Sequence, residues 1–306
     1  MIYENYIHTT LYLNITSKCQ MGCNYCQLGK GNEVASLGDM IKALETIRPE
    51  LLVITGGEPL LYPDLLLNFL KFYEVDYKKH WDIILCSSLL YDTSKDKVLE
   101  VLNHIDDLQY TYSLDRINKI GKDIFISRIK EYRSNVRNIL SIITLTEDVV
   151  NKYESEEEIK GYIEEALQYT DKLGLELLSY DSSIDYITYQ NKADRFIGIA
   201  FKYIPKDKNV LLHKWETYYN SSLSVNCNSC DISCAYTMLP NGNIKKQCNC
   251  AIDRNTELRK QKFMNMCVNC DIFGYCKVGC ERFGPACGFP KNTFNKYLKG
   301  DYDNEL

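Results

Sequence analysis

The chain lacks the features of a membrane protein, a secreted protein and a nucleic-acid-binding protein. Among its 306 residues, no apolar run reaches the length of about eighteen residues that a membrane-spanning helix needs. The N-terminal run Met-Ile-Tyr-Glu-Asn-Tyr has no basic segment followed by an apolar one, so it does not resemble a signal peptide. The net charge is −5, whereas a nucleic-acid-binding surface normally gives a basic excess. We therefore expect a cytoplasmic protein with no membrane partner and no nucleic-acid partner.

Histidine is scarce throughout the chain, and cysteine is scarce in its first two-thirds. The four histidines are scattered and show no metal-ligand spacing. Only four of the fourteen cysteines precede residue 227, and the other ten lie between Cys227 and Cys287. With no secretion signal and a chain long enough to bury a core, this usage indicates metal binding rather than a disulfide framework. The change in cysteine density predicts two domains, residues 1–210 and residues 211–306.

Three of the early cysteines, Cys19, Cys23 and Cys26, lie close together in the run Cys-Gln-Met-Gly-Cys-Asn-Tyr-Cys. Three thiolates on one loop can bind three irons of a [4Fe–4S] cluster and leave the fourth iron open to another ligand. A zinc site or disulfides are the alternative, but zinc sites usually pair two close ligands with two distant ones. The spacing therefore favours an iron–sulfur cluster with one open coordination position.

The first two-thirds of the chain alternate strand-like and helix-like segments. We expect strands at residues 11–15, 51–54, 83–86, 110–114, 139–145 and 175–178. We expect helices at residues 38–48 with Asp39 as N-cap, 64–73, 98–105, 124–133, 154–173 ended by Gly174, and 194–203 within a bridge to the second domain. This α/β alternation predicts a parallel sheet covered by helices, and six units suit a partial TIM-like (β/α)6 barrel. Chemistry in such barrels lies at the carboxyl ends of the strands, where the cysteines follow the first strand.

A second motif, Thr55-Gly56-Gly57-Glu58-Pro59, follows the second expected strand. Glycines let the backbone approach a ligand closely, although the motif alone also suits a tight strand-to-helix turn. Together with the three cysteines, the motif resembles the radical SAM superfamily, whose members commonly have a (β/α)6 partial barrel. The resemblance implies that S-adenosylmethionine binds the open iron and is cleaved to a 5′-deoxyadenosyl radical. It also implies that Gly56, Gly57 and Glu58 contact the methionyl amino group of this cofactor.

The resemblance implies three further cofactor contacts. Tyr25 stands where the family has an aromatic residue beside the adenine, although it is one of 24 tyrosines and also suits a core position. Ser113 matches a serine that helps hold the cofactor carboxylate in sulfatase-maturing and peptide-modifying enzymes, but Arg116 replaces the glycine of their Ser-Leu-Asp-Gly run. The family also uses a downstream arginine for this carboxylate, and we favour Arg128 over Arg116. Where the family often has Thr-Asn-Gly, this chain has Cys86-Ser87-Ser88, whose hydroxyls suit the ribose and whose thiol we expect to be buried.

The C-terminal domain carries its own signature. The cysteines from Cys267 to Cys280 follow the pattern C-x2-C-x5-C-x3-C, and Cys287 comes after six further residues. This pattern matches the SPASM extension, which carries two auxiliary [4Fe–4S] clusters. Upstream, the run Met238-Leu-Pro-Asn-Gly-Asn-Ile244 predicts a hairpin between two short strands. Zinc sites are the alternative, since Cys-x-x-Cys pairs also bind zinc.

The SPASM pattern implies the ligands of both auxiliary clusters. Two full clusters need eight thiolates, and this segment has ten cysteines. One cluster takes Cys267, Cys270, Cys276 and Cys287. The other cluster takes Cys230, Cys234, Cys248 and Cys280. Cys227 competes with Cys230 for this second cluster, and Cys250 competes with Cys248.

The resemblance to SPASM proteins implies an oxidoreductase that abstracts hydrogen from a peptide or protein and leaves a crosslink, a thioether or a dehydrogenated product in ribosomal peptide maturation. The expected partners are that substrate and a reductant such as flavodoxin or ferredoxin. Only eighteen residues precede Cys19, so we expect any leader recognition to need a separate leader-binding protein or another surface of this one.

Two kinds of alternative stay open. A small-molecule dehydrogenase or a sulfatase-type maturase is the alternative enzyme of the same family. A non-catalytic Fe–S electron-transfer protein is the alternative class, against which the Gly-Gly-Glu-Pro motif argues because an electron carrier needs no site for a cofactor amino group. The sequence identifies no residue as a catalytic base or radical relay.

Overall fold

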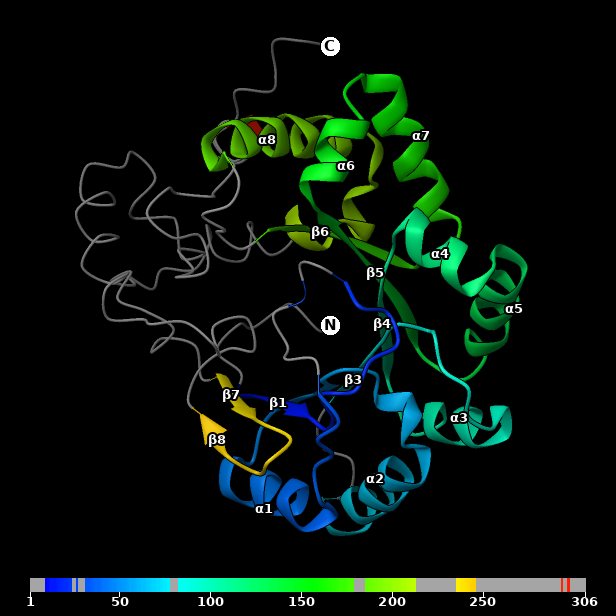
Figure 1. The fold of residues 1–306 in the computed structure, drawn as a ribbon, viewed down its shortest axis with the longest axis vertical. Helices are drawn as coiled ribbons and strands as arrows, with labels where there is room; N and C mark the ends of the chain where they lie inside the picture. The colour runs from blue at the N-terminus through cyan, green and yellow to red at the C-terminus, as the bar shows by residue number, and fades with distance from the viewer. Residues whose placement is uncertain are drawn as a thin grey trace, which may run out of the picture.

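The computed structural model describes residues 9–23, 26, 31–77, 82–178, 185–212, 235–245, 293 and 296–297. In these ranges eight strands form one sheet in the order β6-β5-β4-β3-β2-β1-β7-β8 (Figure 1). The strands are β1 Thr10–Asn14, β2 Leu51–Thr55, β3 Asp82–Ser87, β4 Asp107–Thr111, β5 Asn138–Leu145, β6 Lys172–Leu177, β7 Ala235–Met238 and β8 Ile244–Lys245. Every neighbouring pair is parallel except β7 and β8. This mostly parallel α/β sheet is consistent with the predicted partial barrel.

Helices connect the parallel strands and lie outside the arc that the strands follow in Figure 1. They are α1 Leu37–Ile47, α2 Pro63–Tyr77, α3 Lys95–Leu102, α4 Leu114–Ile120, α5 Lys122–Tyr132, α6 Glu147–Lys152, α7 Glu156–Leu167 and α8 Tyr186–Tyr203, with short 3-10 turns η1 Pro59–Leu61 and η2 Lys206–Lys208. None of the helices in the described ranges combines the length and the hydrophobicity that crossing a membrane requires.

The hydrophobic core lies between the sheet and these helices. Alternate strand residues such as Leu13, Ile54 and Leu85 have no exposed surface and join one core with helix residues such as Met40. The opposite face of the sheet lines the concave side of the arc. Strands buried on both faces have near-continuous hydrophobic runs, which explains why Leu51-Leu52-Val53-Ile54 predicted β2.

The fourth strand lies earlier in the chain than predicted. The sequence favoured residues 110–114, but β4 ends at Thr111 and α4 begins at Leu114. Ser113 is the N-cap of α4, and its hydroxyl accepts a hydrogen bond from the Arg116 amide at 3.4 Å. The first helix is also capped differently than predicted, because Ser36 accepts from the Asp39 amide and Asp39 lies in the first turn. A side chain that satisfies a free amide at the helix start decides both boundaries.

The predicted helix over residues 154–173 is wrong at its C-terminal end. A helix, α7, ends at Leu167, and Gly174 lies inside β6, which pairs with β5. A Cβ atom on Gly174 would lie 2.6 Å from the Ile142 side chain, so this glycine serves close packing between strands and does not end a helix. Strand pairing, which joins residues far apart in the chain, overrides the local helical pattern here. Neither α4 nor α6 was predicted from the sequence, and the predicted start of α8 lies eight residues late.

The predicted hairpin near residue 241 is confirmed. Met238 pairs with Ile244 and Thr237 with Lys245 in antiparallel register. The first strand of the hairpin, β7, also pairs in parallel with β1 over residues 10–13. A segment that the sequence analysis assigned to the second domain therefore extends the sheet that carries the cysteines.

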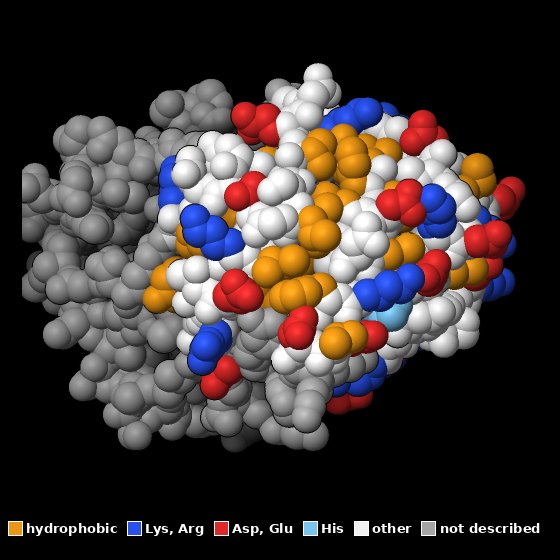
Figure 2. All heavy atoms as spheres, turned by 90° about the horizontal axis from the view of Figure 1, so that it is seen from below, with side chains coloured by type: hydrophobic (Ala, Val, Ile, Leu, Met, Phe, Trp, Pro, Cys, Tyr) orange, Lys and Arg blue, Asp and Glu red, His pale blue; other side chains and the backbone are white. Residues whose placement is uncertain are grey.

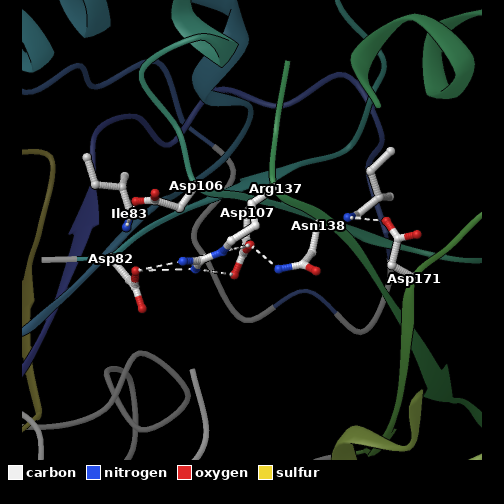
Figure 3. A network of polar contacts seen from close by, with 8 residues as sticks. Asp82, Ile83, Asp106, Asp107, Arg137, Asn138 and Asp171 are labelled. Carbon is white, nitrogen blue, oxygen red and sulfur yellow. Dashed lines mark hydrogen bonds and ion pairs between the residues drawn. The ribbon is translucent and has the colours of Figure 1, made fainter. Parts of the chain in front are cut away.

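A polar network joins the amino ends of β3, β4 and β5 (Figure 3). The fully buried Asp107 accepts hydrogen bonds from Asn138 at 2.7 Å and from the Arg137 guanidinium at 3.4 Å. Arg137 also donates to Asp82 at 3.2 Å. Burial raises the pKa of Asp107, while the bonds from Asn138 and Arg137 act in the opposite direction. In barrels the amino-terminal edge of the sheet contributes to stability, whereas the active site lies at the carboxyl-terminal edge. We therefore assign this network to stability.

The described part of the outer surface over α1 and α2 has no large patch of one charge (Figure 2). Acidic and basic side chains alternate there with hydrophobic ones (Figure 2).

Candidate functional site

The three early cysteines lie on a loop that leaves the carboxyl end of β1, as predicted. We call residues 18–30 the cysteine loop. The backbone on either side of the loop is paired: Ser17 and Glu33 exchange two hydrogen bonds of 3.0 Å, and the Ala35 amide donates to the Ile15 carbonyl at 2.8 Å. This paired stem fixes where the loop begins and ends, at the edge of the sheet where parallel α/β folds place their chemistry.

The cysteine side chains face outward to different extents. Cys19 and Cys26 are exposed, and Cys23 is half-buried. The Cys26 amide donates to the Cys23 carbonyl at 3.2 Å, which turns the backbone between these two residues. Burial raises the pKa of the Cys19 thiol, the Glu58 charge raises it further, and the Arg116 charge opposes both.

The donor set fits a [4Fe–4S] cluster by chemistry. In the part of the chain that the structure describes, no three His, Cys, Asp or Glu side chains converge on a position for a single metal ion. A cluster does not need such convergence, because each thiolate binds a different iron at a corner of the cube. Three thiols on one loop whose ends are held together by hydrogen bonds thus suit a cluster better than a single metal ion.

Helix α4 holds the cysteine loop from the side. The Arg116 guanidinium donates to the Cys23 Sγ atom at 3.3 Å. One turn later, the Lys119 ammonium donates to the Met21 carbonyl at 2.7 Å and to the Gln20 carbonyl at 3.2 Å. The sequence analysis did not predict this pair of cations beside the loop. The signal that was available is the helix N-cap at Ser113 followed by basic residues at i+3 and i+6, which places both on one helix face.

Gly56 and Gly57 lie against the backbone that leads into the cysteine loop. The Gly57 amide donates to the Thr16 carbonyl at 2.6 Å, and the Glu58 amide donates to the Lys18 carbonyl at 2.8 Å. A Cβ atom on Gly57 would lie 2.0 Å from the Lys18 carbonyl oxygen, and Gly56 has a φ of +123°. Both positions therefore require glycine for the close approach of two protein segments. The predicted contact with a cofactor amino group stays a prediction, and the geometry places these glycines beside the cysteine loop.

The Glu58 carboxylate is fully buried and accepts hydrogen bonds from two loops. The Ser87 hydroxyl donates at 3.0 Å, the Ser88 amide at 2.6 Å and the Leu60 amide at 3.0 Å, and the Ser88 hydroxyl donates as well. Burial raises the pKa of Glu58, and these four groups oppose the rise. The side chain thus connects the turn after β2 to the end of β3. The two serine hydroxyls, predicted to suit a ribose, donate their hydrogen bonds to this carboxylate.

The other predicted cofactor residues lie in different surroundings. The Arg128 guanidinium donates to the carbonyls of Leu89 and Tyr91 and stands over the Tyr91 ring, 4.4 Å from its centroid. The arginine bonded to a loop cysteine is Arg116, which the sequence analysis ranked second. A role for Arg128 at a carboxylate stays a prediction, whereas its contact with the loop after β3 is a finding.

Cys86 lies in β3 and is half-buried, whereas the sequence predicted a buried thiol. Burial raises the pKa of its thiol to about 12, while a hydrogen bond with Thr55 opposes the rise. Such a thiol stays protonated near neutral pH, which agrees with the expected uncharged, non-ligating cysteine.

The remaining predicted residues lie outside the described ranges. They are Tyr25, Cys227, Cys230, Cys234, Cys248, Cys250, Cys267, Cys270, Cys276, Cys280 and Cys287.

Comparison with known proteins agrees with the site around the cysteine loop. The model of the "Radical SAM superfamily" matches residues 13–166, about half of the chain. A curated "Probable GTP 3',8-cyclase" from Archaeoglobus fulgidus is 34% identical over 76 residues, which cover 22% of this chain and 26% of that protein. The chain therefore spans about a quarter of that relative's length in the match. The family match includes the cysteine loop, the Gly56-Gly57-Glu58 turn and α4, and it shows that the chain belongs to the radical SAM superfamily.

Proposed function

We propose that the protein binds a [4Fe–4S] cluster through Cys19, Cys23 and Cys26 and uses it with S-adenosylmethionine in radical chemistry. When bound, these two groups supply the reductive cleavage of the sulfonium and a 5′-deoxyadenosyl radical that abstracts a hydrogen atom from the substrate. The observation that carries the proposal is the stapled cysteine loop, held at the carboxyl edge of the sheet between the Gly56-Gly57 turn and α4.

The chain's own residues bind and orient these groups. The cysteine loop offers three thiols, and its fixed stem sets their position relative to β1. The Gly56-Gly57 turn lies against that stem, which supports its proposed contact with the cofactor amino group. Ser113 begins α4 and is the proposed contact for the cofactor carboxylate, together with an arginine. The barrel that we propose around them would shield a radical from water and oxygen.

A first experiment tests this chemistry directly. The anaerobically reconstituted protein is reduced in the presence of S-adenosylmethionine, and 5′-deoxyadenosine is measured by chromatography. The proposal expects several turnovers in the wild-type protein and none in Cys23→Ala, with Cys86→Ala as the matched cysteine control that retains turnover. A wild-type protein that binds iron and sulfide but forms no 5′-deoxyadenosine above background would overturn the proposal.

For the substrate, we propose a peptide or protein that is oxidised during ribosomal peptide maturation. The cysteine-rich segment supports this proposal through its resemblance to the SPASM signature at Cys267–Cys280 and the hairpin at residues 235–245. Two auxiliary clusters in that segment would accept the electron that an oxidised product must lose. A reductant such as flavodoxin or ferredoxin, a separate leader-binding protein and a cytoplasmic location belong to the same proposal.

A second candidate substrate is a nucleotide. The observation that favours it is the 34% identity over 76 residues with the probable GTP 3′,8-cyclase. The reduced protein is incubated in parallel with GTP and with a peptide encoded beside its gene, and products are analysed by mass spectrometry. Loss of two hydrogens from the peptide supports the maturase, whereas a GTP-derived product supports the nucleotide enzyme. A product from neither would overturn both substrate assignments and leave the cofactor chemistry to the first experiment.

A further inference from the structure

The Arg116 guanidinium donates a hydrogen bond to the sulfur of Cys23, one of the three cysteines of the cysteine loop. The two residues lie 93 positions apart in the sequence, so the contact depends on the fold and not on local chain geometry. A donor–acceptor distance of 3.3 Å is short for sulfur, whose radius exceeds that of oxygen. The guanidinium is thus directed at the sulfur atom itself.

Neighbouring bonds hold Arg116 in this position. The Ser113 cap fixes the Arg116 amide at the start of α4. Lys119, one turn further, is bonded to two carbonyls of the cysteine loop. The loop and the helix are therefore joined at two points, by Arg116 at the Cys23 sulfur and by Lys119 at two backbone carbonyls. The two contacts can be separated by mutation.

The charge balance beside the sulfur gives this contact a chemical consequence. A guanidinium stays protonated at every pH at which the protein is folded. Reduction of a cluster adds one negative charge to a core whose thiolate sulfurs already carry negative charge. A cation and a hydrogen bond at one of those sulfurs stabilise the reduced form more than the oxidised form, and such bonds are known to tune cluster potentials.

We propose that Arg116 is a positioning residue that raises the reduction potential of the cluster bound by Cys19, Cys23 and Cys26 through its hydrogen bond to the Cys23 sulfur. This inference rests on the proposed function, because it requires the cluster to be present. It adds to that function the residue that makes the first electron transfer into the cluster easier. It also assigns a purpose to the arginine that stands where related enzymes have glycine.

The test is a redox titration of the reconstituted holoprotein, followed by the EPR signal of the reduced cluster without S-adenosylmethionine. Arg116→Gln keeps an N–H donor but removes the charge, and Arg116→Lys keeps the charge but removes the planar fork. Lys119→Gln is the matched control, because it removes a charge of the same helix face that touches only carbonyls. The proposal expects Arg116→Gln to lower the reduction equilibrium constant about tenfold, or about 59 mV for a one-electron couple. It expects a smaller shift in Arg116→Lys and the smallest in Lys119→Gln.

Equal potentials in Arg116→Gln and Lys119→Gln, at matched iron content, would overturn the inference. If Arg116→Gln does not retain a cluster, a second measurement on the wild-type protein decides. Protein labelled with ¹⁵N-arginine is reduced and examined by pulsed EPR for coupling between the cluster spin and an arginine nitrogen. The inference expects this coupling in the wild type and its loss in Arg116→Lys, and absence of the coupling in the wild type would overturn it. Failure of the wild type to bind any cluster would instead refute the proposed function.

Discussion

At the scale of single residues, Glu58 shows how hydrogen bonds offset part of the cost of burying a carboxylate. Its carboxylate has no exposed surface, and donors from the turns after β2 and β3 surround it. A buried carboxylate is tolerated when hydrogen bonds replace its hydration shell, and removing the acceptor leaves the donors unsatisfied instead. The residue therefore connects two turns that lie beside the cysteine loop.

We predict that Glu58→Ala destabilises the protein by roughly 3 kcal/mol or more and Glu58→Gln by roughly 1–2 kcal/mol, because Gln keeps one acceptor oxygen for these donors. Urea denaturation of the anaerobically purified protein, followed by circular dichroism, measures both changes. A matched control is Glu50→Gln, at a position on the surface before β2. Equal stability of Glu58→Ala and the wild type would show that the donors find other acceptors.

Cys86 gives a prediction on pH. Its thiol pKa is raised to about 12 in the folded protein, so the thiolate fraction at pH 8 is about a thousandfold lower than for a thiol with the ordinary value near 9. Alkylation by iodoacetamide requires the thiolate. We expect the Cys86 peptide to react far more slowly in the folded protein than in urea, and the folded rate to keep rising with pH beyond 9. A plateau of the folded rate near pH 9 in mass-spectrometric peptide mapping would contradict the raised pKa.

At the scale of elements, α4 is short but carries much of the site. Its seven residues begin at the Ser113 cap and include both cations that hold the cysteine loop. So short a helix is marginal by itself, and its cap and tertiary contacts decide whether it forms. A substitution of the Ser113 cap should therefore also disturb the position of the cysteine loop.

We predict that Ser113→Ala lowers the free energy of unfolding by about 1 kcal/mol and lowers the amount of iron retained after reconstitution. Ser113→Thr should keep both the helix cap and the iron content. Iron and sulfide analysis together with thermal unfolding measure the two effects. The alternative outcome is informative, because normal iron content with lost S-adenosylmethionine cleavage would assign Ser113 to the cofactor carboxylate only.

The same scale shows what the sequence could predict. Runs of Leu, Ile and Val mark β2, β3 and β5, whereas β1 was predicted from its alternation of apolar and polar residues. All six predicted strands match β1 to β6 to within three residues at either end. The helix predicted over residues 154–173 failed because Lys172, Leu173 and Gly174 pair with β5, which a local helical pattern does not reveal. The cysteine spacing and the Gly56-Gly57 motif predicted the place of the site. Arg116 and Lys119 were missed because their contacts span nearly a hundred residues.

At the scale of the whole molecule, the end of the described chain returns to the barrel. Thr293 is buried and donates to Asp194 in α8 through its amide at 3.1 Å and its hydroxyl at 2.5 Å. The Tyr297 ring packs edge-on against Phe201, with 4.9 Å between ring centroids. Thr293 and Tyr297, which follow the cysteine-rich segment in the sequence, thus lie against α8.

We predict that Thr293→Val destabilises the contact between the C-terminal residues and α8 by roughly 1–2 kcal/mol. The substitution removes the hydroxyl donor while it conserves the size of the side chain. Hydrogen exchange should become faster in α8 around residues 194–201 and stay unchanged in β2 and β3. Thr293→Ser, which keeps the hydroxyl, is the matched control and should exchange like the wild type. Unchanged exchange in α8 of Thr293→Val would mean that other contacts hold the chain end.

The pairing of β1 with β7 has a consequence for how the protein is made. The outer edge of β1 is completed only by residues 235–238, which are synthesised about 220 residues after β1. At ribosomal speeds of roughly 5–20 residues per second, that edge waits on the order of ten to forty seconds for its partner. An unpaired hydrophobic strand edge invites pairing with other chains during this time. A chain that stops before residue 235 would keep this edge of β1 open, and the strand that leads into the cysteine loop would be exposed to pairing with other chains.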